Sequence, residues 1–243
     1  MTAGAAYQQP LPKSPLRIVL LPGLDGTGKF CTPLAQALET SWDVQVVHYP
    51  AHLSRYSDLL PWLRAKLVGE NFALVAESFS GPLALQLSAS QPQGLKALVL
   101  VASFARPPRL VPASFASLLR GLPLGSKAIA FLAKRFLIGP FKDNRFLTDF
   151  SLALRSVPNK VLVGRLGETL RVNELATLTQ IAVPKLAVVA AQDWLVASRR
   201  TQDFRKAGWR VETVEGPHFL TFANPKGSAR AIEDFLRQLP ETC

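Results

Sequence analysis

Ser78 is the residue of this chain best placed for covalent chemistry. It lies between an apolar run, residues 72–76, and a helix-like segment, residues 82–89, that begins with proline. A sharp turn from strand to helix would expose the Ser78 hydroxyl and crowd the positions two before and two after it. Both hold small side chains, Ala76 and Ser80, where the usual nucleophile pattern has glycine. The same residues also fit a serine that only caps a helix.

A nucleophilic serine needs partners, because its hydroxyl attacks a carbonyl only with an imidazole base and a carboxylate that orients the base. The chain has three histidines. His48 and His52 precede Ser78 in the chain, at the end of a strand-like run and in the loop after it. His218 follows the strand-like residues 210–214. A loop histidine at the end of a strand can reach the serine, and His218 is the candidate base.

The candidate carboxylate is Asp193, which closes the apolar run of residues 185–191. The carboxyl end of a buried parallel strand faces the crevice in which open α/β sheets bind their ligands. Asp193 could instead cap the next helix. Asp203 is a weaker candidate, because residues 201–206 have the pattern of an exposed amphipathic helix.

Strand-like and helix-like segments alternate along the 243 residues, of which 48% are hydrophobic and 19% charged. This composition argues against disorder, and the alternation predicts one α/β domain with about six strands in a mostly parallel sheet covered by helices on both faces. The strand-like runs are residues 18–21, 44–47, 73–75, 97–101, 187–190 and 211–214. Residues 1–15 are expected to form a flexible tail.

The order of Ser78, Asp193 and His218 along the chain resembles that of the α/β-hydrolase superfamily. The resemblance covers residues 17–238. It implies an α/β-hydrolase fold in which these three side chains form a catalytic triad. In this family a helical cap is inserted over the active site, and residues 104–182 occupy that place here.

A second part of the resemblance lies in residues 17–28, a strand-like run that enters a glycine-rich loop. In the family this loop supplies one backbone N–H of the oxyanion hole, which implies Leu24 here, and the residue after the nucleophile, Phe79, supplies the other. The glycines Gly26 and Gly28 could also belong to a phosphate-binding loop. That reading is disfavoured, because the spacing of neither a P-loop nor a dinucleotide fingerprint is present.

The expected division is therefore a hydrolase core, residues 16–103 and 183–243, and a helical cap, residues 104–182. The cap carries 12 Lys or Arg and four Asp or Glu, which is +8 of the chain's net charge of +11. A basic surface attracts acidic partners, here an acyl carrier protein, an anionic membrane surface or an acidic substrate. A general contribution to solubility is the alternative. The candidate docking residues are Lys127, Lys134, Arg135, Lys142 and Arg145.

The expected function is hydrolysis of a carboxylic ester or thioester through an acyl-enzyme, with no metal and no organic cofactor. The size and basic insertion make the chain loosely similar to pimeloyl acyl carrier protein methyl ester esterases, which implies an acyl carrier protein as partner. Residues 21–28 and 77–79 also resemble those of plastid phytyl ester synthases, which implies an acyltransferase. A non-catalytic receptor of the same fold, binding a small ligand, is the alternative of another class.

Composition limits the remaining classes of function. Nucleic acid is not expected as a partner, because the basic residues are not interleaved with aromatic residues. No apolar run has the length of a transmembrane segment, and no signal peptide is recognisable, so a cytoplasmic protein is expected. The two cysteines suggest no disulfide framework, and no Cys/His cluster has the spacing of a metal site.

Overall fold

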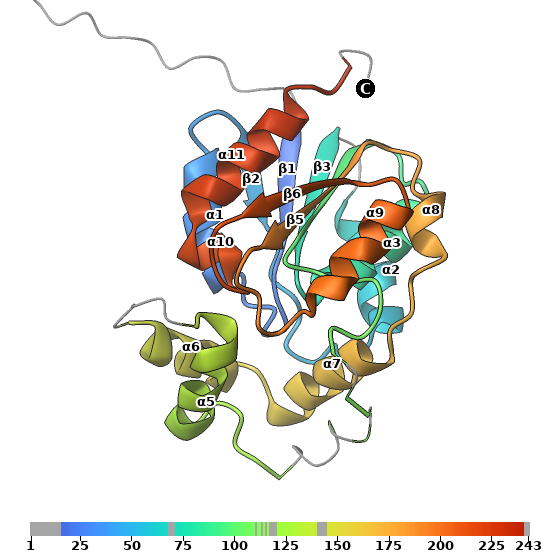
Figure 1. Ribbon diagram of the computed structural model, residues 1–243. Helices are drawn as coiled ribbons and strands as arrows, with labels where there is room; N and C mark the ends of the chain where they lie inside the picture. The colour runs from blue at the N-terminus through green and yellow to red at the C-terminus, as the bar shows by residue number, and fades with distance from the viewer. Residues whose placement is uncertain are drawn as a thin grey trace, which may run out of the picture.

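A single parallel sheet organises the chain, as a computed structural model shows (Figure 1). The structure describes residues 16–67, 71–109, 111, 112, 114, 116, 121–139 and 145–240. Six strands pair in the order β2-β1-β3-β4-β5-β6, and every pair is parallel. They are β1 (Arg17–Leu21), β2 (Asp43–Val46), β3 (Phe72–Glu77), β4 (Leu95–Val101), β5 (Lys185–Ala190) and β6 (Arg210–Val214). The predicted mostly parallel sheet of about six strands is confirmed.

Helices cover both faces of the sheet, because neighbouring side chains of a strand point to opposite faces. In the central strand β3, Leu74 packs into one apolar cluster and Val75 into another. Burial of each such side chain contributes about 1.5–3 kcal/mol. Figure 1 shows one group of helices on each side of the sheet. The helices on the side of Leu74 are α2 (Tyr56–Lys66), α3 (Ser80–Ala89), α8 (Thr177–Gln180) and α9 (Thr201–Lys206), and those on the side of Val75 are α1 (Thr32–Leu38), α10 (Leu220–Ala223) and α11 (Pro225–Leu236).

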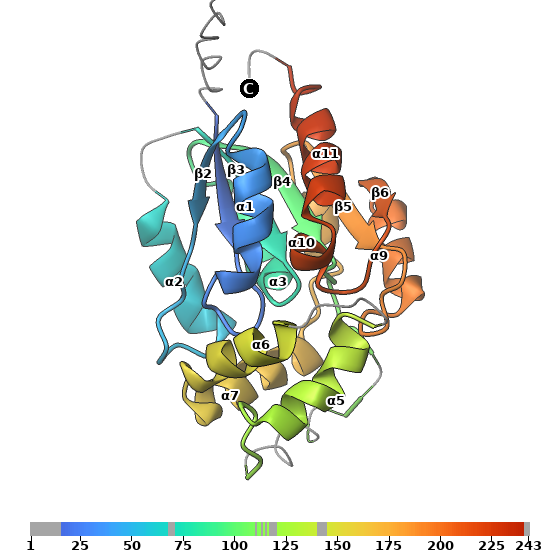
Figure 2. The same ribbon diagram turned by 90° about the vertical axis from the view of Figure 1, so that its left-hand side faces the viewer.

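A third group of helices lies beyond the carboxyl ends of the strands (Figures 1 and 2). It comprises α5 (Lys127–Leu137), α6 (Phe146–Arg155) and α7 (Asn159–Arg171), all from the segment between β4 and β5. Their apolar sides form a separate cluster that includes Phe30, from the short 3-10 helix η1 (Lys29–Cys31). Phe30 packs against Phe146 of α6 and, edge-on, against Phe219 in the loop after β6, with ring centroids 5.8 and 5.0 Å apart. Aromatic packing thus attaches these helices to loops at the carboxyl edge.

Two sequence expectations about the fold need comment. The helix over residues 201–206 forms as α9, but the expectation that Asp203 is exposed is wrong. Its carboxylate is buried and accepts two hydrogen bonds from Arg106, at 2.7 and 2.8 Å. The expected tail, residues 1–15, lies outside the described residues. In the described part of the chain, no helix has the length and hydropathy needed to cross a lipid bilayer.

Candidate active site

Ser78 occupies the turn between β3 and α3, and its backbone adopts a left-handed conformation with φ of 47°. This conformation costs a non-glycine residue about 1–2 kcal/mol. The surroundings hold it in place, because the Ser78 N–H donates to the carbonyl of Val101 and the Ser103 hydroxyl donates to the carbonyl of Ser78, at 3.0 and 2.7 Å. Gly81 makes room for Ser103, since a Cβ at position 81 would lie 1.8 Å from the Ser103 Oγ. Contacts with the neighbouring strand β4 and the loop after it therefore hold the strained Ser78 turn in place.

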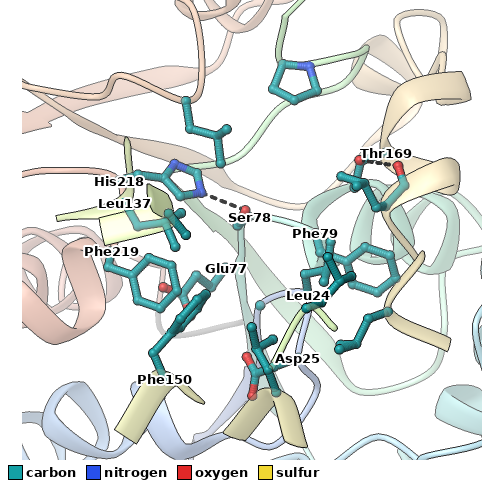
Figure 3. Close-up of a pocket in the computed structure, with 18 of the residues that line it drawn as sticks. Leu24, Asp25, Glu77, Ser78, Phe79, Leu137, Phe150, Thr169, His218 and Phe219 are labelled. Carbon is teal, nitrogen blue, oxygen red and sulfur yellow. Dashed lines mark hydrogen bonds between the residues drawn. The ribbon is translucent and has the colours of Figure 1, made fainter. Parts of the chain in front are cut away.

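The alternative that Ser78 only caps a helix is wrong. Helix α3 begins at Ser80, its N-cap position is Phe79, and no side chain makes a capping hydrogen bond there. The Ser78 hydroxyl instead lies 2.8 Å from Nε2 of His218 (Figure 3). The serine side chain is thus directed across the carboxyl edge of the sheet.

His218 joins Ser78 to Asp193. The imidazole Nδ1 lies 2.8 Å from Oδ2 of Asp193. An ionised carboxylate can only accept a hydrogen bond, so it keeps a proton on Nδ1 and leaves Nε2 to accept from the Ser78 hydroxyl. This is the hydrogen-bond arrangement of a serine nucleophile with its base and orienting acid.

The alternative that Asp193 caps the next helix is wrong, because that helix, η2 (Ser198–Arg200), has Ala197 at its N-cap and no side-chain capping hydrogen bond. The second oxygen of Asp193 instead holds a turn of the loop after β5. Oδ1 accepts hydrogen bonds from the backbone N–H groups of Leu195 and Val196, at 2.8 and 2.7 Å. The carboxylate is therefore fixed from both ends, with one oxygen on the backbone and the other on His218. Because the carboxylate cannot rotate freely, it holds the imidazole of His218 in one orientation before a substrate binds.

The other candidates from the sequence do not meet Ser78. His48 bonds the carbonyl of Thr27, with Nδ1 and the oxygen 2.5 Å apart, and His52 is exposed. Neither lines the cavity that contains Ser78. Asp203 pairs with Arg106, as described above. The structure thus brings Ser78, Asp193 and His218 together.

The surroundings of His218 set its proton affinity. Burial alone would lower the pKa of His218, but the charge and hydrogen bond of Asp193, together with the charge of Glu77, raise it above its ordinary value. Glu77 is itself buried, which raises its own pKa, and its carboxylate accepts a hydrogen bond from the Thr221 hydroxyl at 2.7 Å. The site therefore stabilises the protonated form of His218 more than water would, which suits a group that takes up a proton during a reaction.

The backbone donors expected at the oxyanion hole lie beside Ser78. Leu24 and Phe79 line the same cavity as Ser78 and His218. Neither of their backbone N–H groups donates a hydrogen bond to another described residue. A hydrogen bond from Gly26 N–H to the carbonyl of Gly23, 3.0 Å long, closes the loop around Leu24. Both N–H groups are thus available for a ligand oxygen.

The cavity over Ser78 has a volume of about 350 Å³ and is lined almost entirely by apolar side chains (Figure 3). Its walls come from the Ser78 turn, from the loops around Leu24 and His218, and from the inner sides of α5, α6 and α7. Besides His218, its charged lining residues are Asp25, Glu77 and Arg109. Among the described residues, no group of three His, Cys, Asp or Glu side chains could hold a metal ion.

Comparison with solved structures decides the fold. Bromoperoxidase from Bacillus anthracis superposes with a TM-score of 0.79 at 14% identity, covering 93% of each chain. The chain has the α/β-hydrolase fold. The enol-lactonase from Burkholderia xenovorans LB400 gives a TM-score of 0.78 at 17% identity, covering 93% of this chain and 92% of that one. A structure from a study of carboxylesterases of Nitrososphaera gargenis gives 0.77 at 16%, covering 94% and 92%.

Sequence comparison adds nothing to this result, because neither a protein-family model nor a curated protein matches the chain. Identities of 14 to 17% to the three structures named above show the fold alone. The names bromoperoxidase, enol-lactonase and carboxylesterase denote different chemistries, and one fold supports many reactions. The fold alone therefore does not define the reaction of this protein, which depends on the residues around Ser78.

Arg165 is a site residue that the sequence did not reveal. It projects from α7, its side chain has no exposed surface, and burial lowers its pKa. The guanidinium donates to four backbone carbonyls, those of Leu24, Asp25, Pro50 and Leu53, at 2.8 to 3.1 Å. Two of these carbonyls belong to the loop that carries the Leu24 N–H. Arg165 therefore fixes the peptide groups next to a candidate oxyanion donor.

Replacing Arg165 with methionine is expected to lower kcat on an ester substrate about 100-fold with little change in KM. The reason is that the Leu24 N–H loses its fixed position, and one oxyanion donor contributes roughly 10²–10³ in rate. Stability should also fall, by about 2–4 kcal/mol, because buried carbonyls lose their donor. Kinetics should be measured well below the midpoint of thermal unfolding.

The matched control is Arg171→Met, in the same helix, whose exposed guanidinium lies 3.6 Å from Glu168. It should leave kcat unchanged. If Arg165→Met lowers the unfolding midpoint but the folded variant retains wild-type kcat, Arg165 holds the loops together without positioning the donor.

Four of the candidate docking residues lie in the described part of the chain, on the helices beyond the sheet. Lys127, Lys134 and Arg135 lie on α5, and Arg145 is exposed at the start of α6. Lys142 lies outside the described residues. Arg135 packs over the ring of Trp194, 4.5 Å from its centroid, which connects α5 with the residue that follows Asp193. Docking through these residues stays a prediction.

Proposed function

We propose that the protein is a serine hydrolase that cleaves a carboxylic ester or thioester through an acyl-enzyme. The observation that carries the proposal is the continuous hydrogen-bond chain from Ser78 through His218 to Asp193, with both links 2.8 Å long. A helix-capping serine would not need these two hydrogen bonds. A receptor would gain nothing from the strained backbone of Ser78. The fold, shared with hydrolases, esterases and lactonases, agrees with the proposal.

The first half of the reaction forms the acyl-enzyme. The Ser78 oxygen attacks the carbonyl carbon while Nε2 of His218 takes its proton, and the positive imidazolium is stabilised by Asp193. The carbonyl oxygen becomes an oxyanion that accepts hydrogen bonds from the N–H groups of Leu24 and Phe79. When the tetrahedral intermediate collapses, the bond to the leaving group breaks and His218 returns the proton to the departing alcohol or thiol.

The second half releases the acid. Water gives a proton to His218 and attacks the acyl carbon, the oxyanion forms again at the same donors, and the bond to the Ser78 oxygen breaks. The proton on His218 then returns to Ser78. An alcohol in place of water would give acyl transfer, which is the alternative outcome for the same acyl-enzyme.

The lining of the cavity favours an apolar acyl group. Leu137, Phe150 and Phe219 surround the space in front of Ser78, and a volume of about 350 Å³ lies within the range of small-molecule sites. An acyl chain of several carbons could bury most of its surface there. A carrier-protein-linked acyl ester is one form of such a substrate, with the carrier held outside the cavity.

A series of p-nitrophenyl esters tests the proposal. We expect kcat/KM to rise about four-fold for each methylene added, because a buried methylene contributes about 0.8 kcal/mol, until the cavity is filled. Ala133→Phe, which narrows the wall formed by α5, should move the optimum to shorter chains. A parallel series of acyl thioesters shows which leaving group is preferred.

Two results would contradict the proposal or redirect it. Hydrolysis that stays at the level of a buffer blank for every chain length, with a folded protein, would favour a receptor. Formation of a new ester from an added alcohol at the expense of the free acid would make the protein an acyltransferase.

A further inference from the structure

Helix α5 has two apolar sides, and only one of them is used inside the molecule. Ile129, Ala133 and Leu137 line the cavity over Ser78, and Ala130 and Ile138 are buried in the cluster beneath it. A surface helix normally turns its other side to water with polar residues. In α5 the other side carries large apolar side chains beside its cations.

The outer side of α5 consists of two rows of residues spaced by four. Three large apolar side chains in these rows are exposed: Phe131 at 67%, Leu132 at 64% and Phe136 at 51% of their full surface. Lys127 and Arg135 stand beside them and are exposed as well. We call this surface, formed by Lys127, Phe131, Leu132, Arg135 and Phe136, the outer face of α5. Single exposed apolar residues are ordinary, but three adjacent ones beside two cations mark an interaction surface.

We propose that the outer face of α5 docks onto an anionic lipid bilayer. A helix that lies in a membrane interface buries a strip of Phe or Leu among the acyl chains, while Lys and Arg beside the strip meet the lipid headgroups. The outer face of α5 has this composition. Figure 2 shows α5 at the end of the molecule opposite α11.

Charge and apolar surface together favour an anionic bilayer over two other partners, a second copy of the chain and an acidic carrier protein. A second copy of the chain is disfavoured, because residues 104–182 carry a net charge of +8 and two such segments would repel each other. An acidic carrier protein would match the charge, but its acidic surface would not cover the exposed apolar side chains of Phe131, Leu132 and Phe136. An anionic bilayer satisfies both the charge and the apolar surface.

Helix α5 also has contacts with both loops that carry the Ser78 partners. The Leu137 carbonyl accepts a hydrogen bond of 3.0 Å from the N–H of Phe219, the residue after His218. Arg135 packs over Trp194, the residue after Asp193. A bilayer bound at α5 therefore lies close to the cavity over Ser78, on the opposite side of a single helix.

Co-sedimentation with vesicles tests the proposal independently of any enzymatic activity. Vesicles of phosphatidylcholine with about 30% phosphatidylglycerol should bind the protein. Pure phosphatidylcholine vesicles should bind it at least ten-fold more weakly. Binding should also weaken between low and high salt, because screening shortens the reach of the cations.

Variants locate the binding surface. The double variant Phe131→Ser with Leu132→Ser should reduce the partition coefficient at least ten-fold, and Lys127→Gln should reduce it about five-fold. Leu175→Ser is the matched control, since Leu175 is an exposed leucine, 37% accessible, outside α5. It should bind vesicles like the wild type, and circular dichroism should show all variants folded.

The proposal is overturned if the anionic vesicles do not bind the protein, or if the double variant binds them as well as the wild type does. Two further outcomes would assign the outer face to another partner. In the first, the wild type binds no vesicles but binds an acidic acyl carrier protein, and the double variant loses that binding. In the second, the wild type forms a concentration-dependent dimer, and the double variant does not.

Discussion

Replacing Ser78 with alanine is expected to lower kcat/KM on a p-nitrophenyl ester by about a million-fold. Loss of a serine nucleophile removes the covalent pathway and leaves only the contribution of the oxyanion hole and of substrate binding. The same variant should fail to react with a fluorophosphonate, which forms a covalent bond with an activated serine. Labelling followed by mass spectrometry should place the probe on Ser78 in the wild type.

Ser80 provides the matched control, because it lies two residues away and has no exposed surface. Its hydroxyl bonds the carbonyl of Pro22 and the Tyr49 hydroxyl. Ser80→Ala should destabilise the protein by about 1–3 kcal/mol by leaving buried polar groups unpaired, and it should only slow labelling. Labelling that survives Ser78→Ala and disappears in Ser80→Ala would mean that Ser80 is the nucleophile.

The sheet and the Ser78 turn were predictable because their signals are local. A run of buried β-strand residues before Ser78 and a proline-led helix after it define the turn within about twenty residues of sequence. The small residues on either side of the turn, Ala76 and Ser80, have no exposed surface. The reason for glycine at position 81 was not visible, because it depends on Ser103, just after the neighbouring strand β4.

The meeting of Asp193 and His218 was predictable for a topological reason. Both residues follow a strand of a parallel sheet, and the carboxyl ends of such strands lie at one edge. The sequence left open that Asp193 instead caps the next helix, but that helix has no side-chain cap. The oxygen that does not contact His218 holds the turn at Leu195 and Val196, a contact that the sequence did not indicate.

Arg165 could not be predicted, because its signal is not local. In the sequence it is one of 28 Lys or Arg residues, and nothing in α7 distinguishes it from Arg171. Only the packing of α7 against the loops after β1 and β2 removes it from water and brings four carbonyls to its guanidinium. The net charge of the chain therefore overstates the basic surface by at least this residue.

Asp193→Asn is expected to lower kcat/KM about 10,000-fold, because it reverses the tautomer of His218. The backbone N–H groups of Leu195 and Val196 will keep the amide oxygen of the substituted side chain toward them, as they now hold Oδ1 of Asp193. The amide NH₂ then faces Nδ1 of His218, which must become the acceptor. The ring proton moves to Nε2, so His218 can no longer accept the proton of Ser78.

The pH profile separates this explanation from a simple loss of structure. The wild type needs neutral His218, and the pKa of His218 is raised, so kcat/KM should fall as the pH drops through that raised pKa. Without the charge of Asp193, burial lowers the pKa of His218, and the acidic limb of the residual activity should move to lower pH. Asp203→Asn, which removes a buried carboxylate that pairs with Arg106, should leave the limb in place. An acidic limb at the same pH in wild type and Asp193→Asn would mean that Asp193 does not set the protonation of His218.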